Sequence, residues 1–219
     1  MVSSSSATRA ETTADFLRQA IKNGDYMGGE RLIEQTLAGQ LNVSQNTIRD
    51  ALRILEGEGW VVKTARHGVY VRSFNPAEAE ELYTLWAAVE GLALRWAMES
   101  LTKTALGHLR RLIQEARKQA LMGDSNGATE HIFTLHTAIV ALSGRAQTIE
   151  LLTSLHNRVR LLEIVRQMRT PRSLHAHQTQ IILYEKLVSL MESGDADAAQ
   201  QLLHYLIMDD AATLIPLLG

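Results

Sequence analysis

The chain of 219 residues contains no cysteine, only three prolines and no apolar run as long as a membrane span. The absence of cysteine excludes disulfides and cysteine-ligated zinc. A transmembrane helix needs roughly 18 consecutive apolar residues, so we expect no membrane association. The net charge of −2 means that nucleic-acid binding would require a local basic patch, because the chain as a whole is not basic.

Pro76 divides the chain into two parts with different patterns. Before it, helical segments alternate with short β-rich runs, and after it almost every segment has helical periodicity. We therefore expect a mainly α protein, with a winged helix-turn-helix at residues 8–75 and an all-helical bundle of about six helices at residues 77–219. Residues 1–7 are rich in serine and lack the apolar core of a signal peptide, which predicts a disordered leader and a cytoplasmic protein.

Residues 37–71 are the most informative part of the first half. An amphipathic run is followed by Ser44, which is suited to cap a second helix that carries polar residues at its start. Gly57 marks the end of this helix, and β-rich runs at 60–62 and 69–71 follow. A helix, a tight turn, a second helix and a two-stranded wing form a winged helix-turn-helix, whose second helix enters a DNA major groove.

The candidate DNA contacts lie at the start of this second helix, at the wing turn and on nearby basic residues. Gln and Asn side chains pair with adenine, and Arg pairs with guanine or phosphate. The predicted contacts are Arg31, Ser44, Gln45, Asn46, Thr47, Arg49, Arg53, Arg66, His67 and Gly68. Residues 11–75 hold eight basic and eight acidic residues, so a solvated polar surface is the alternative interpretation.

Apolar residues at helical spacing predict the remaining helices. In the first half we expect helices at residues 14–23 and 32–41. In the second half the expected helices are 77–100, 104–121, 128–142, 147–168, 173–191 and 197–217.

The first half resembles the GntR family of bacterial transcription regulators in the segment ADFLRQAIKNGDYMGGERLIEQTLAGQLNVSQNTIRDALRILEGEGWV and in HGVYV. The second half resembles the FCD effector domain of the FadR-like subclass, VanR-type branch, in LYTLWAAVEGLALRWA, FTLHTAIVALSG and LVSLMESGDADAAQQLL. The resemblance implies a homodimer on an inverted-repeat double-stranded DNA operator, most simply a repressor that a small-molecule effector releases. Many members have Arg at the position of Gln45, which implies a shift of base preference from guanine toward adenine.

The resemblance also places the effector pocket and shows where this chain departs from the family. Metal-binding FCD domains use one Asp and three His, and a common Arg lies nearby. The corresponding pocket residues here are Trp86, Ile132, His136, Tyr184 and Leu206. One imidazole is too few ligands for a divalent ion, which predicts no metal and no cofactor. A carboxylate would lose its main charge partners, so the resemblance implies an aromatic or largely apolar effector.

Three alternatives remain open. A shifted metal site would recruit some of His131, His175, His177 and His204 around His136. An enzyme is not expected, because the sequence has no nucleophile elbow, phosphate loop or cofactor fingerprint. A DNA-binding regulator whose helical domain only dimerises, without any ligand, is the other alternative.

Overall fold

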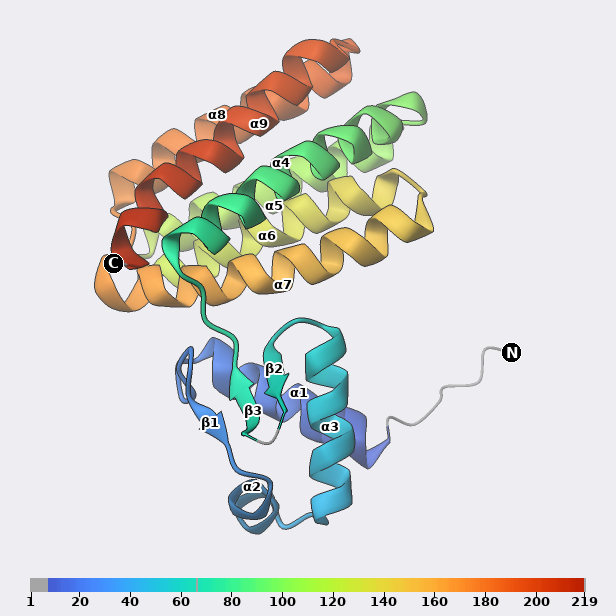
Figure 1. Ribbon diagram of the computed structural model, residues 1–219. Helices are drawn as coiled ribbons and strands as arrows, with labels where there is room; N and C mark the ends of the chain where they lie inside the picture. Colours follow the sequence, from blue (N-terminus) through green and yellow to red (C-terminus); the bar gives the residue numbers. More distant parts are fainter. Residues whose placement is uncertain (1–7, 66, 219) are drawn as a thin grey trace.

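In the computed structural model, which describes residues 8–65 and 67–218, a small N-terminal unit with three short strands adjoins a bundle of long helices (Figure 1). The expected mainly α fold, with a winged helix and a helical bundle, is confirmed. The expected leader at residues 1–7 and the wing residue Arg66 lie outside the described residues. In the part that the structure describes, no helix is long and apolar enough to cross a bilayer.

The N-terminal unit contains α1 (Arg9–Lys22), α2 (Glu34–Leu41) and α3 (Gln45–Gly57). Helix α1 begins earlier than the sequence pattern predicts, because a capping box extends it. The Thr8 hydroxyl accepts a hydrogen bond from the Glu11 backbone amide, and the Glu11 carboxylate accepts one from the Thr8 backbone amide. The turn of the helix-turn-helix passes through Asn42, which ends α2 in the left-handed conformation (φ 52°).

Three short antiparallel strands, in the order β1-β3-β2, complete this unit: β1 (Arg31–Leu32), β2 (Val61–Thr64) and β3 (Gly68–Val71). The prediction that a helix begins at residue 32 was wrong, because Arg31–Leu32 pairs with β3. Leu32 is buried under this ladder. A single buried Leu fits a two-residue strand and a helix start equally well, so periodicity could not separate the two.

The C-terminal part consists of six α-helices and a terminal 3₁₀ turn, all within residues 76–218. They are α4 (Pro76–Glu99), α5 (Lys103–Leu121), α6 (Ser125–Leu142), α7 (Ala146–Arg169), α8 (Leu174–Ser193), α9 (Ala196–Leu214) and η1 (Ile215–Leu218). The last helix ends before the predicted residue 217. Pro216 has no amide hydrogen to continue an α-helical ladder, and the chain tightens into η1 there.

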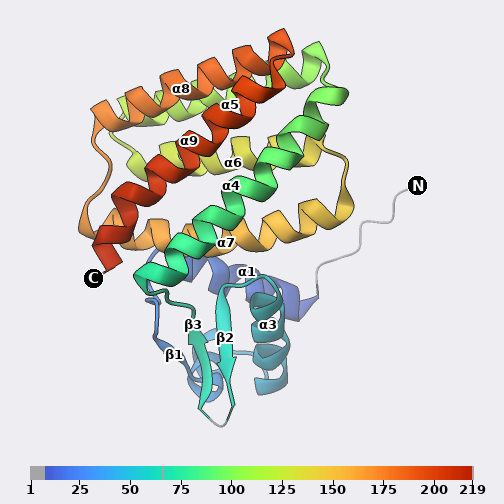
Figure 2. The same cartoon turned by 45° about the horizontal axis from the view of Figure 1, so that its top comes forward.

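Helix α7 lies along the side of the bundle that faces the N-terminal unit (Figures 1 and 2). Its adjacent residues Leu162 and Leu161 are buried in different hydrophobic cores, Leu162 in the bundle and Leu161 in the winged helix. The Asn157 side chain donates a hydrogen bond of 3.1 Å to the Glu58 carbonyl, just after α3. Helix α7 is therefore part of both units at once.

Candidate DNA-binding surface and effector cavity

The start of α3 presents polar side chains to solvent. The Ser44 hydroxyl caps the helix by accepting the Thr47 amide at 3.1 Å, and the two hydroxyl oxygens lie 2.8 Å apart. Gln45 and Asn46 occupy the exposed first turn. Of these four predicted contacts, Ser44 and Thr47 are engaged in the cap, and the Asn46 side-chain oxygen accepts a hydrogen bond of 3.4 Å from Arg49.

Both predicted arginines of α3 have acidic neighbours that the sequence interpretation did not consider. The Arg49 Nε donates to a Glu34 carboxylate oxygen at 2.6 Å, and the Arg49 side chain is 50% exposed. Arg53 pairs with Asp50 at 3.1 Å and is more exposed. Ion pairs at this exposure contribute little to stability. DNA phosphate can therefore compete for both guanidinium groups.

The wing turn and Arg31 lie together. Strand pairing places Arg31 opposite Tyr70, and a Cβ at Gly68 would lie 3.0 Å from the Arg31 Nε. Gly68 has a φ of 109°, which a side chain would strain. His67 beside it is exposed, and its carbonyl accepts the Tyr70 hydroxyl at 3.1 Å. In both ribbon views the start of α3 and the turn end of the β2–β3 hairpin face away from the bundle (Figures 1 and 2).

The five residues predicted for an effector pocket line one cavity of about 20 Å³ between the bundle helices. They come from α4, α6, α8 and α9. A cavity of this size holds about one water molecule, whereas metabolite sites measure roughly 300–1,000 Å³. The structure thus brings the predicted residues together around a cavity that is too small for a metabolite.

At the centre of this region, the fully buried Glu90 carboxylate accepts three side-chain donors. They are the Trp86 indole N–H, His136 Nδ1 at 2.6 Å and His156 Nε2 at 2.9 Å. Burial alone would raise the pKa of Glu90, but the two imidazoles lower it to about 2. The carboxylate is therefore ionised throughout the physiological range.

Both ring nitrogens of His136 have hydrogen-bond partners in this network. The Nδ1–H group donates to Glu90, and Nε2 lies 2.7 Å from the Tyr184 hydroxyl oxygen. Burial raises the pKa of Tyr184, so its hydroxyl keeps the proton that it donates. Burial also lowers the pKa of His156, which favours a neutral ring that donates from Nε2. Every polar atom of the His136 ring has a partner, as expected for a buried histidine.

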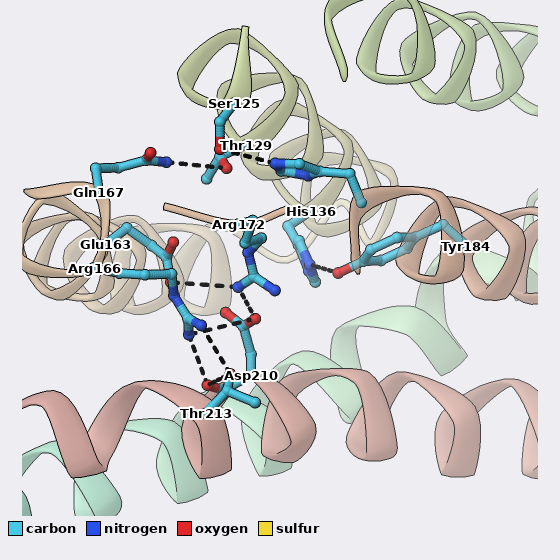
Figure 3. A network of polar contacts seen from close by, with 11 residues as sticks. Ser125, Thr129, His136, Glu163, Arg166, Gln167, Arg172, Tyr184, Asp210 and Thr213 are labelled. Carbon is cyan, nitrogen blue, oxygen red and sulfur yellow. Dashed lines mark hydrogen bonds and ion pairs between the residues drawn. The ribbon is translucent and has the colours of Figure 1, made fainter. Parts of the chain in front are cut away.

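The other end of the cavity is charged, through an arginine and the two carboxylates around it. Arg172 lines the cavity, pairs with Asp210, and approaches Glu163 at 3.6 Å (Figure 3). Arg166 donates to Glu163 at 3.0 Å and to the Asp210 carbonyl at 2.8 Å. Burial and then Asp210 raise the pKa of Glu163 to about 7.

The histidines of the alternative metal site do not converge. His177 contacts the Ser125 hydroxyl at 2.9 Å, and burial followed by Arg172 lowers its pKa to about 4. His175 and His204 are exposed on different helices. Within residues 8–65 and 67–218, no three His, Asp or Glu side chains are arranged to hold a metal ion.

Sequence reasoning missed His156 as a partner of Glu90, and it missed Glu163 and Arg172 as cavity residues. A signal existed for the first two, because His156 and Glu163 interrupt an apolar helix pattern at Leu155, Val159 and Leu162. Arg172 follows the end of α7 in a loop, where no periodicity marks a side chain as buried.

Comparisons with known proteins match both parts of the chain. The family described as "Bacterial regulatory proteins, gntR family" matches residues 9–71, and the family described as "FCD domain" matches residues 81–209. The Nta operon transcriptional regulator of Aminobacter aminovorans is 28% identical over 74% of this chain and 77% of its own length. The "Probable D-xylose utilization operon transcriptional repressor" of Paenarthrobacter nicotinovorans is 24% identical over 90% of this chain and 84% of its own.

Other relatives match over shorter spans or by fold. The chain spans about half (46%) of the transcriptional regulator YdhC of Bacillus subtilis, at 30% identity. A GntR transcriptional regulator from Rhodococcus sp. RHA1 superposes with a TM-score of 0.80 and 26% identity, covering 96% of this chain and 99% of that one. Escherichia coli McbR/YncC superposes with a TM-score of 0.84 at 19% identity, over 98% and 100% of the two chains, and shows a shared fold.

Proposed function

Because this chain belongs to the GntR family of bacterial regulators and carries an FCD domain, we propose that it is a ligand-responsive transcriptional repressor. It binds an inverted-repeat operator as a homodimer, and a small-molecule effector in the helical domain releases it. The relatives are named as transcriptional regulators, two of them for operons and one as a repressor, which supports this role over an enzymatic one. Six helices in residues 76–214 support the VanR-type branch.

The proposal that this chain binds DNA rests on one observation: the start of α3 and the wing face the same way. Gln45 and Asn46 are exposed on the first turn of α3, while Arg31 and His67 gather at Gly68. Base-reading amides on a helix start and basic groups on a wing suit a major groove and the adjoining backbone. The polar residues of these elements thus form one surface that fits a DNA half-site.

A homodimer through the helical domain is supported by an exposed apolar stripe on α4. The sequence pattern places Leu82, Leu85, Val89 and Leu92 at heptad-like spacing, but only Leu82 is buried in the bundle. Leu85 and Leu92 are 48% and 49% exposed, one heptad apart. Two-fold pairing along this stripe would bury both leucines.

Light scattering on the full chain tests this pairing. A Leu85→Glu/Leu92→Glu double variant should be monomeric at micromolar concentration. Ile182→Glu, which alters an exposed apolar residue of α8, should stay dimeric. A dimer that survives both sets of changes would place the interface elsewhere, and a monomeric parent would refute the dimer itself.

The buried polar network supports a ligand over the alternative of a domain that only dimerises. A dimerisation bundle needs only apolar packing, yet this core buries Glu90 with two imidazoles and an indole. Ionised groups in a core cost desolvation energy, and such clusters concentrate at functional sites. The aromatic residues Trp86 and Tyr184 supply apolar surface around this polar centre.

We propose an aromatic or largely apolar effector with one polar end. Arg172 is the cavity's cationic group, but Asp210 and Glu163 already surround it, so an anionic ligand would have to displace a buried carboxylate. A Tyr184→Phe variant should lose affinity for such a ligand, whereas Tyr205→Phe, which alters an exposed Tyr of α9, should not.

A thermal-shift screen of aromatic metabolites and small dicarboxylates, repeated with both tyrosine variants, tests the effector. An aromatic compound that raises the melting temperature and weakens operator binding would support the proposal, because a ligand that binds only the folded state stabilises it. A screen in which no compound shifts the melting temperature would favour the domain that only dimerises.

A further inference from the structure

The closed cavity adjoins a much larger polar cleft. This cleft, of about 760 Å³, lies between α1 of the winged helix and the bundle helices α6 and α7. Thr129, Phe133 and Glu163 line both the cleft and the 20 Å³ cavity. The side chains of these three residues therefore form a shared wall between a space that fits a metabolite and a space that does not.

Phe133 is the apolar part of this wall and is held from both sides. On the cavity side its ring stacks on Trp86, with centroids 6.2 Å apart and planes at 15°. On the cleft side the Arg160 guanidinium lies 4.7 Å from the ring centroid. A rotation of Phe133 out of the wall would break both contacts and join the two spaces.

Glu163 is the polar part of the wall. Its Oε1 accepts a hydrogen bond from the Arg166 side chain. Its Oε2 is buried and makes no hydrogen bond to any residue that the structure describes. The Thr129 hydroxyl accepts a hydrogen bond of 3.4 Å from the Gln167 side chain, and this bond bridges α6 and α7 (Figure 3). An unpaired buried polar atom is costly, and a hydrogen-bonding group of a ligand would satisfy it.

We propose that the effector enters through this interdomain cleft, with Phe133 as the gate, and that the cleft holds the part of the ligand that extends beyond the cavity. This inference rests on the proposed function, since it concerns the same effector. The ligand class follows from the wall: an apolar or aromatic group displaces Phe133, and a hydroxyl hydrogen-bonds with Glu163 Oε2, donating to the carboxylate or accepting from its protonated form.

The gate is tied to the DNA-binding unit by a chain of ion pairs. The Arg160 Nε lies 3.5 Å from one Glu130 oxygen, and the other Glu130 oxygen lies 3.7 Å from the Lys22 Nζ. Lys22 is in the last turn of α1, which packs against α3, and its ammonium lies 6.0 Å from the centroid of the Trp60 ring. Moving Arg160 off Phe133 would disturb Glu130 and Lys22, so gate opening and the position of the winged helix are coupled.

Trp86 fluorescence can report gate opening without any effector. In a full-length Trp60→Phe/Trp96→Phe background, acrylamide quenching measures access to Trp86 alone. Arg160→Ala should raise the quenching constant roughly two- to fivefold, the factor that a cation–π contact is worth at a partly exposed site. Arg145→Ala is the matched control, because Arg145 lies 5.3 Å over the ring at position 96 and 3.9 Å from Glu99, away from the wall.

Equal quenching in the parent, Arg160→Ala and Arg145→Ala would overturn the gate.

A second measurement uses indole as the probe. Indole should raise the melting temperature of Phe133→Ala, or of the milder Phe133→Leu if the first does not fold, and leave the parent unchanged. An equal shift in the parent would show that the cavity is reached without the gate. Neither measurement needs an effector or operator, so a failed metabolite screen leaves both results standing.

Discussion

Replacing Glu90 by Gln should remove the central acceptor of the bundle core while keeping its volume. The amide of Gln offers an N–H₂ group where the carboxylate accepts, so at least one of Trp86, His136 and His156 loses its partner. The pKa of Glu90 lies at about 2, below its usual 4.5. At about 1.36 kcal/mol per pKa unit, this lowering of the Glu90 pKa corresponds to roughly 3 kcal/mol of folding free energy. For a chain of this size the melting temperature should fall by roughly 6–12 °C.

The pH dependence distinguishes this electrostatic effect from simple loss of packing. A carboxyl whose pKa is lowered in the folded state stabilises fully above its unfolded value of 4.5, and this contribution is lost as the pH falls toward 2. Urea unfolding followed by circular dichroism should therefore show a smaller gap between the parent and Glu90→Gln at pH 3 than at pH 6. Glu99→Gln, at an exposed position of the same helix, should match the parent at both. A gap that does not change with pH would refute the reasoning.

Further predictions concern Glu163, the DNA contacts and the metal content of the protein. In urea unfolding, the parent should lose stability as the pH rises from 4.5 to 7, because folded Glu163, with a pKa of about 7, holds a proton that the unfolded chain releases. Glu163→Gln should reduce this loss, and an unchanged slope of stability against pH would contradict the prediction. Arg49→Ala should abolish specific DNA binding in a gel-shift assay. Gln45→Arg should change the consensus of the selected DNA sequences at one symmetric position. A consensus like that of the parent would show that Gln45 reads no base. Elemental analysis of protein purified without chelator should find no stoichiometric transition metal, whereas one metal per chain that is lost in His136→Ala would show a relocated site.

The fold was largely predictable because its signals are local. Ser44 and Asn75 cap helices, Gly68 permits the wing turn, and apolar spacing marks each bundle helix. The errors fall where a tertiary contact decides the outcome. Strand β1 exists only because Arg31 and Leu32 pair with β3, and no local pattern distinguishes this from a helix start.

The cavity was predictable only in part. The positions of Trp86, His136 and Tyr184 follow from the family resemblance, and the structure places all three on one cavity. Its charged end depends on Arg172, a loop residue that the chain path returns to Asp210 on another helix. Long-range pairing of this kind leaves no periodic trace in the sequence, so the missing metal ligands give no sign of the charge that Arg172 brings to the cavity.

Selection of binding sites from random duplex DNA by the full-length protein tests the central claim most directly. If the chain is a dimeric regulator that reads DNA with α3 and the wing, the selected sequences should form an inverted repeat, with half-sites about one helical turn apart. Binding to this sequence should weaken steeply with salt, because phosphate contacts release counterions. Enrichment of no sequence, or of an isolated half-site without symmetry, would contradict the account.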